Sequence, residues 1–184
     1  TMGSMSLMDV GIYTVEDLHA YREQRDDFVI QLIDGELVMT PGPSVPHQVV
    51  HSEVFGILRE AVPDNLRVFS APLDLRAGER TVIQPDLMVV DRDVRTGSEV
   101  VRAPSLVVEI LSPSSRRTDL VRKPEALARF GVEHYWVIDP EHPAIREFRL
   151  VDGRYVTAQI VEGEDLFSTD APFPVSFRPL DLTR

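Results

Sequence analysis

The chain contains no cysteine, and this absence excludes several kinds of chemistry. Disulfide bonds, thiolate zinc sites and a cysteine nucleophile are all ruled out. Any metal ion must therefore be held by oxygen or imidazole ligands. The lack of cysteine also fits a reducing compartment, so we expect a cytoplasmic location.

Long hydrophobic runs are missing as well. No apolar stretch approaches the roughly 18 residues of a membrane-spanning helix, so no membrane association is expected. With 43% hydrophobic and 27% charged residues among 184, the composition is typical of one globular domain. No leader pattern opens the chain, and residues 1–4 resemble an expression scar. We therefore expect a single domain over residues 5–184.

Positive charge is scarce, because 19 basic residues stand against 30 acidic ones and give a net charge of -11. This balance argues against broad attraction to a polyanion. The charge is nevertheless uneven, since Arg116, Arg117, Arg122 and Lys123 lie close together with only Asp119 to oppose them. This local basic segment makes the three arginines candidate phosphate contacts.

Two Asp-Gly pairs mark predicted hairpins. Asp-Gly readily supplies the two positive-φ positions of a type I′ turn between antiparallel strands. We therefore expect one hairpin near each end of the chain. The predicted strands are residues 28–33 with 36–39 and residues 145–150 with 154–160.

The remaining pattern alternates between helices and strands. Apolar positions in residues 47–62 follow one helical face, Thr14 can cap a first helix, and residues 124–130 predict a third. Extended stretches rich in leucine and β-branched residues are 66–75, 82–90, 105–111 and 134–138. The strand, helix, strand order from 105 to 138 favours a parallel crossover, so we predict a mixed sheet. The proline-rich tail, 172–179, is expected to wrap the surface.

Two carboxylates stand out because they adjoin apolar strands. Glu109 shares its strand face with Val107 and Leu111, while Asp86 opens another apolar run. Burial of an ionised carboxylate in a strand costs on the order of several kcal/mol unless a cation or hydrogen bonds compensate. The alternatives are that Asp86 only marks a strand entrance and that Glu109 reaches solvent or Arg102.

Lys123 follows these two acids along the chain. Two acids on adjacent strands with a lysine close behind are the arrangement that a metal-dependent phosphodiesterase uses. Because Pro124 comes next, we expect Lys123 near a helix N-terminus, although a helix that begins near Thr118 would be kinked at the proline. A solvated surface lysine is the alternative. Asp119 either orients Lys123 or forms a surface pair with a neighbouring arginine.

Further metal-ligand candidates lie on the helix predicted over residues 47–62. His47 and His51 are four positions apart, a spacing that places two imidazoles on one face. Ordinary surface or packing histidines are the alternative, because no glutamate follows at a familiar interval. Glu53 is a secondary carboxylate candidate. The serines of residues 112–115 lack a nucleophile-elbow motif, so a serine hydrolase is not favoured.

Four segments together resemble the bacterial Uma-type family of restriction endonucleases, a branch of the PD-(D/E)XK nuclease superfamily. They are QPDLMVV at 84–90, APSLVVEILSPS at 103–114, Lys123, and GVEHYWVIDP at 131–140. The similarity extends from about Tyr13 to Leu180. It implies a restriction-endonuclease-like α/β fold, with a central mixed β-sheet flanked by helices.

The resemblance also implies a site. Asp86, Glu109 and the backbone carbonyl of Ile110 would be the metal ligands, and Lys123 would be the catalytic lysine. The implied cofactor is Mg²⁺ or Mn²⁺. The chain departs from the superfamily pattern at Leu111, where the E-x-K form has lysine, and at Gln31, where relatives commonly carry glutamate.

These features lead to two hypotheses of function. The first is a metal-dependent endonuclease that hydrolyses DNA phosphodiester bonds. The alternative is a catalytically weak or inactive nuclease-fold module for binding or assembly, which the acidic net charge favours. DNA is the expected partner, and a homodimer or higher homo-oligomer is expected because two strands must be cut.

Overall fold

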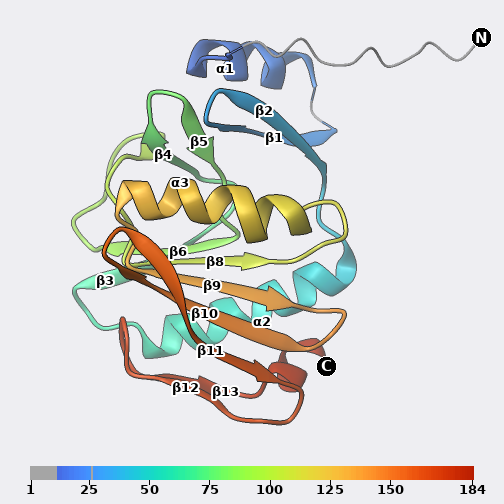
Figure 1. Cartoon of the computed structure of the whole chain (residues 1–184), viewed down its shortest axis with the longest axis vertical. Coiled ribbons are helices and arrows are strands. Elements are labelled where there is room, and N and C mark those ends of the chain that lie inside the picture. The colour runs from blue at the N-terminus through green and yellow to red at the C-terminus, as the bar shows by residue number, and fades with distance from the viewer. Residues whose placement is uncertain (1–11, 26) are drawn as a thin grey trace, which may run out of the picture.

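Two sheets contain most of the strands of this computed structural model, which describes residues 12–25 and 27–184 (Figure 1). The first sheet has the order β2 (Glu36–Pro41), β1 (Phe28–Ile33), β5 (Thr81–Ile83), β4 (Asp74–Gly78) and β7 (Glu99–Val100). The second has the order β11 (Arg154–Glu162), β10 (Ala144–Val151), β9 (His134–Asp139), β8 (Leu106–Ile110), β6 (Leu87–Asp91) and β3 (Leu66–Ser70). The N-terminal hairpin therefore belongs to a separate sheet. Residues 1–4 lie outside the described residues.

The six-stranded sheet is mixed. Strands β8 and β9 are parallel, and the other neighbouring pairs are antiparallel. The connection between β8 and β9 contains the π-helical turn η1 (Thr118–Arg122) and helix α3 (Lys123–Phe130). This arrangement confirms the predicted parallel crossover.

Helices cover both faces of this sheet. In Figure 1, α3 crosses in front of the sheet and α2 (Val45–Ala61) lies behind it. The apolar stripe of α2 packs Val50, Val54 and Leu58 against the rear face. None of the helices in the described part of the chain is long and apolar enough to cross a membrane.

Two of the predicted strands are each divided at a proline. Residues 66–75 form β3 and β4, with Pro72 between them, and residues 82–90 form β5 and β6, with Pro85 between them. Proline has no N–H to donate to a ladder, so pairing is interrupted at these points. At both breaks the chain crosses from one sheet to the other. Asp86 lies at one of these crossings.

Strand β8 is buried on both faces, as its sequence predicts. Leu106, Val108 and Ile110 enter the core beneath α2, while Val107 enters the core beneath α3. Glu109 shares the α3 side and is 2% exposed. Side chains alternate between the two faces of a strand, and both faces of β8 are covered. The Glu109 carboxylate therefore lies inside the protein.

Both Asp-Gly hairpins form as predicted. Their turn residues have positive φ values of 52° and 80° at Asp34 and Gly35, and of 49° and 76° at Asp152 and Gly153. The first helix, α1 (Val15–Gln24), is closed at its N-terminus by a capping box formed by Thr14 with the third helical residue.

The proline-rich tail does not simply wrap the surface, so that expectation was wrong. It contributes β13 (Val175–Phe177), which pairs with β12 (Phe167–Thr169), and is followed by the 3₁₀ turn η2 (Pro179–Thr183). Phe173 and Phe177 are buried in the core beneath α2. Burial of these apolar side chains stabilises the packing of the segment against the core.

Candidate active site

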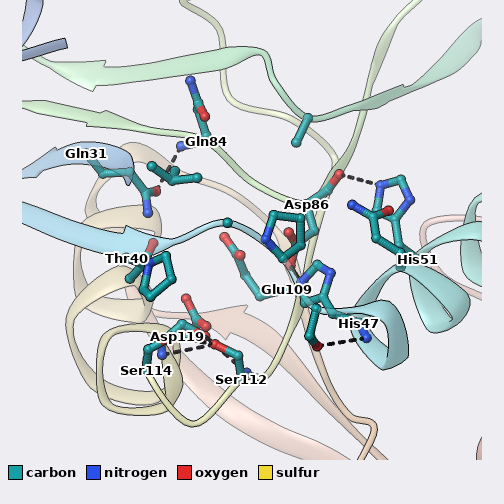
Figure 2. Close-up of a pocket in the computed structure, with 18 of the residues that line it drawn as sticks. Gln31, Thr40, His47, His51, Gln84, Asp86, Glu109, Ser112, Ser114 and Asp119 are labelled. Carbon is teal, nitrogen blue, oxygen red and sulfur yellow. Dashed lines mark hydrogen bonds and ion pairs between the residues drawn. The ribbon is translucent and has the colours of Figure 1, made fainter. Parts of the chain in front are cut away.

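A cleft of about 540 Å³ contains all three residues expected to carry the chemistry. Asp86 comes from the crossing before β6, Glu109 from β8, and Lys123 from the start of α3. The N-terminal half of α2 and residues 112–115 contribute further walls. Figure 2 shows the carboxylates of Asp86, Glu109 and Asp119 gathered around one space.

Asp86 is held by two groups. Its Oδ2 atom accepts a 2.7 Å hydrogen bond from the backbone N–H of Ile110 and lies 3.2 Å from Nε2 of His47. The side chain keeps 19% of its surface exposed, so it remains open to the cleft. The residue is therefore more than a strand entrance, because its carboxylate is fixed in orientation.

The two histidines of α2 contact Asp86 in different ways. His47 meets its carboxylate, whereas His51 Nε2 lies 3.3 Å from its backbone carbonyl and 3.0 Å from Ser70 Oγ. Burial lowers the pKa of His47, but the hydrogen bond and charge of Asp86 raise it more, so it lies above the usual value. The structure thus joins both imidazoles to Asp86.

Lys123 is buried between two carboxylates. Its Nζ atom lies 2.8 Å from Glu109 Oε1 and 2.9 Å from Asp119 Oδ1, and all three side chains are at most 3% exposed. The alternatives of a solvated lysine and a surface pair for Asp119 were therefore wrong. Arg102, the other partner considered for Glu109, instead pairs with Asp91 and Asp93.

The electrostatics of this cluster favour an additional positive charge. Burial raises the pKa of Glu109 well above its usual value, and Lys123 offsets this only in part. Burial lowers the pKa of Lys123, but Asp119 and Glu109 raise it more, so the ammonium holds its proton more tightly than usual. One ammonium faces the three carboxylates of Asp86, Glu109 and Asp119. A proton on Glu109 would reduce this excess of negative charge, and a bound divalent cation would balance it.

A π-helical turn places Asp119 and Lys123 on the same side of the helix. The backbone N–H of Lys123 bonds to the carbonyl of Thr118, five residues earlier. In this spacing the Asp119 carbonyl would accept from residue 124, but Pro124 has no N–H. The hydroxyl of Tyr135 fills the gap with a 2.6 Å hydrogen bond to that carbonyl.

This turn corrects the expected position of Lys123. Helical backbone begins at Arg116 and continues to Phe130, so Lys123 lies inside a helix rather than at its free N-terminus. The kink expected at Pro124 takes the form of the wider turn before it. A π turn is a frequent feature of functional sites in helices.

The donor set of the cleft fits a hard divalent cation. Carboxylate oxygens are the ligands that Mg²⁺ and Mn²⁺ prefer. Glu109 Oε1 and Asp119 Oδ1 are buried and face the ammonium, yet neither accepts a well-aligned hydrogen bond. Over the described residues, however, no three His, Asp or Glu side chains form a preassembled metal cluster. The Lys123 ammonium instead lies between Glu109 and Asp119.

Four other predicted residues lie apart from this centre. Glu53 is exposed on α2 and borders a different depression. Arg116 pairs with Asp139 at 2.6 Å and Arg122 pairs with Glu36 at 2.6 Å, so carboxylates already engage both guanidinium groups. Arg117 is exposed and forms no ion pair within the described part of the chain.

Sequence reasoning assigned no role to some polar residues of the cleft. Gln31 is buried in β1, and its Oε1 accepts a 2.9 Å hydrogen bond from the backbone N–H of Gln84. A polar residue within an apolar strand was the available signal. Ser112 Oγ bonds to the hydroxyls of Ser114 and Ser115, so these serines fasten their own loop.

Comparisons with known proteins place this fold. The crystal structure of a putative nuclease belonging to DUF820 from Anabaena variabilis ATCC 29413 matches with a TM-score of 0.71 and 23% identity, over 84% of this chain and 89% of that one. At this identity the likeness shows the fold, and it confirms a mixed α/β architecture similar to that nuclease structure. A comparison with curated proteins finds no match. The Uma2 family, described as "Putative restriction endonuclease", matches residues 15–183, and the chain therefore belongs to this family.

Proposed function

We propose that the protein is a metal-dependent endonuclease that hydrolyses DNA phosphodiester bonds in the cleft around Asp86, Glu109 and Lys123. The observation that carries the proposal is the buried Lys123 ammonium, 2.8 Å from Glu109 and in the same cleft as Asp86. Membership of the Uma2 family supports a nuclease-type function.

Mg²⁺ or Mn²⁺ would be held by the carboxylates of Asp86 and Glu109, with the backbone carbonyl of Ile110 as a further oxygen ligand. When bound, such an ion lowers the pKa of water and stabilises negative charge on a phosphoryl group. The excess of carboxylates over ammonium groups supports this assignment. The Glu109 oxygen that faces Lys123 without a well-aligned hydrogen bond supports it as well.

Lys123 and His47 would have different roles in the reaction. Because its pKa is raised, Lys123 stays protonated and acts as a positive charge rather than as a base. It would stabilise the negative charge that develops on the phosphate during attack. His47 and the N–H of Ile110 keep the Asp86 carboxylate aimed into the cleft.

The decisive test is cleavage of plasmid DNA with Mg²⁺ or Mn²⁺. Lys123→Met should lower kcat by about 10²- to 10³-fold, the usual effect of removing one charge-stabilising donor, and should change kcat far more than metal affinity. Arg154→Gln is the matched control, because it also removes one positive charge, at an exposed position of β11. It should cleave plasmid DNA at the rate of the unmodified protein. Equal cleavage by the Lys123→Met variant would contradict the assignment.

A second candidate function is a nuclease-fold binding or assembly module without catalysis. The observation that favours it is the ammonium of Lys123, which already pairs with both Glu109 and Asp119. Calorimetric titration of Mn²⁺ into the protein and into Asp86→Ala separates the two candidates. Binding that depends on Asp86 supports the nuclease, and its absence supports the module.

A further inference from the structure

A second depression, of about 260 Å³, is lined by three arginines. Arg59 comes from the C-terminal half of α2, Arg67 from β3, and Arg92 follows β6, with Val68 and Phe69 between them. None of the three guanidinium groups pairs with a carboxylate in the part of the chain that the structure describes. Three like charges gathered in one groove repel one another unless an anion compensates. We call this depression the arginine groove.

The surroundings of the arginine groove leave its charge unbalanced. The catalytic cleft and three other depressions each have a carboxylate in their lining. Asp91 and Asp93, the acids on either side of Arg92, are both engaged by Arg102. The Nε atom of Arg67 is buried without a hydrogen-bond partner among the described residues, and its guanidinium lies 5.8 Å from the centre of the Phe69 ring. Unpaired guanidinium forks match the oxygens of a phosphate group.

The arginine groove adjoins the catalytic cleft along β3, an edge strand of its sheet. Ser70 and Ala71 line the cleft, and the three preceding residues line the groove. The Cα atoms of Ser70 and Arg67 are thus about 10 Å apart along the strand. Helix α2 also contributes to both sites, with His47 in the cleft and Arg59 about 18 Å further along its axis. These lengths span about three to five nucleotide steps of a duplex strand.

We propose that the arginine groove binds phosphodiester groups of the DNA strand, several nucleotides from the bond that lies in the catalytic cleft. This inference rests on the proposed nuclease function. Because the chain carries a net charge of -11, most of its surface repels a polyanion, so binding needs a local cluster of unpaired cations. Arg116 and Arg122 meet this need poorly, since carboxylates already hold them.

The test measures the affinity of the full chain for a fluorescent DNA duplex, by anisotropy in EDTA and over a range of salt concentrations. The groove variant combines Arg59→Gln, Arg67→Gln and Arg92→Gln. The matched control combines substitutions at three exposed arginines without ion pairs in the described part of the chain, namely Arg25→Gln, Arg154→Gln and Arg178→Gln. Both variants have the same net charge.

The groove variant should bind the duplex about tenfold more weakly or worse, and its salt slope should fall by about 0.9 for each phosphate group that it no longer binds. The control should change the dissociation constant by less than about twofold. Equal reductions in both variants, or an unchanged groove variant, would overturn the proposal. Arg67 is partly buried, so the pair Arg59→Gln and Arg92→Gln replaces the triple variant if the latter does not fold.

Two further measurements separate this inference from the nuclease proposal and from a smaller ligand. If the protein cuts no DNA but the groove variant loses duplex binding, the arginine groove stands while the nuclease proposal falls. If the protein cuts DNA and the groove variant keeps its affinity and salt slope, the arginine groove fails alone. Titration with inorganic phosphate tests for a smaller ligand. If the groove variant loses phosphate binding but keeps its affinity for DNA, the DNA assignment is overturned.

Discussion

Lys123 Nζ lies 2.8 Å from Glu109 Oε1, and both side chains are 3% exposed. The two residues lie on neighbouring elements of one crossover, since β8 is in the six-stranded sheet and α3 covers one of its faces. The pair is fully desolvated, so each partner depends on the other for compensation. Asp119 adds a second carboxylate to the same ammonium.

Removal of the Lys123 ammonium should therefore destabilise the protein as well as affect catalysis. Lys123→Met leaves buried carboxylates without a cation, which typically costs about 3 to 5 kcal/mol. Addition of Glu109→Gln to this variant should recover part of the loss, because it removes one uncompensated charge. Urea unfolding at neutral pH measures both free energies. A double variant that is no more stable than Lys123→Met would argue against charge burial as the cause.

Tyr135→Phe tests the hydrogen bond that completes the π-helical turn. Loss of the hydroxyl leaves the Asp119 carbonyl without its 2.6 Å partner, and an unsatisfied buried acceptor costs about 1 to 3 kcal/mol. Tyr21→Phe is the matched control, since its ring packs edge-on against Tyr13 and its substitution keeps that ring contact. Thermal or urea unfolding of the two variants makes the comparison. Equal stabilities would mean that the Asp119 carbonyl is satisfied in another way.

Glu53→Gln should leave DNA cleavage within about twofold of the unmodified protein, because the side chain is exposed outside the cleft around Asp86, Glu109 and Lys123. Glu109→Gln should lower kcat by about 100-fold or more, since it removes a proposed metal ligand that also contacts Lys123. Initial rates of plasmid cleavage at saturating Mg²⁺ measure both. A large loss of cleavage rate in the Glu53→Gln variant would indicate that Glu53 takes part in the site after all.

Asp139 should make stability depend on acid pH. Burial raises its pKa, but the hydrogen bond from Arg116 and the N–H groups of His142 and Glu141 lower it more, so it lies below the usual 3.8. A carboxyl group with a lowered folded-state pKa contributes stability above its unfolded pKa. This contribution is lost as pH falls through the folded pKa.

Asp139→Asn should thus cost up to about 1 kcal/mol near neutral pH, the scale of a partly exposed ion pair. The difference from the unmodified protein should shrink as pH falls below 3.8. Asp165→Asn, at an exposed position, serves as the control for the loss of one carboxylate. Urea unfolding from about pH 3 to about pH 7 gives the curve. A pH-independent difference would assign the effect to packing.

Local patterns predicted most of the elements. Asp-Gly pairs determined both hairpins because few residues adopt positive φ easily, and the spacing of Val50, Val54 and Leu58 determined the buried face of α2. The apolar run around Glu109 correctly indicated a strand covered on both faces. The resemblance to the Uma-type family was confirmed by the family match.

These local patterns could not predict contacts between residues that are distant in the sequence. The split of two predicted strands between different sheets depends on how the chain crosses at Pro72 and Pro85. Whether Arg116 faces a phosphate or Asp139 depends on which residues lie opposite after folding. The same holds for the arginine groove, whose members are spread from position 59 to position 92.

The sequence by itself determined a strand with apolar neighbours on both faces and so predicted a buried carboxylate at position 109, because side chains alternate along a strand. Only the tertiary structure decided that Lys123 and Asp119 would meet it. Their meeting depends on the packing of α3 over β8 and on a π turn, which Tyr135 stabilises from another strand. Secondary structure follows short-range periodicity, whereas a charge cluster requires long-range packing to set the distances between its members.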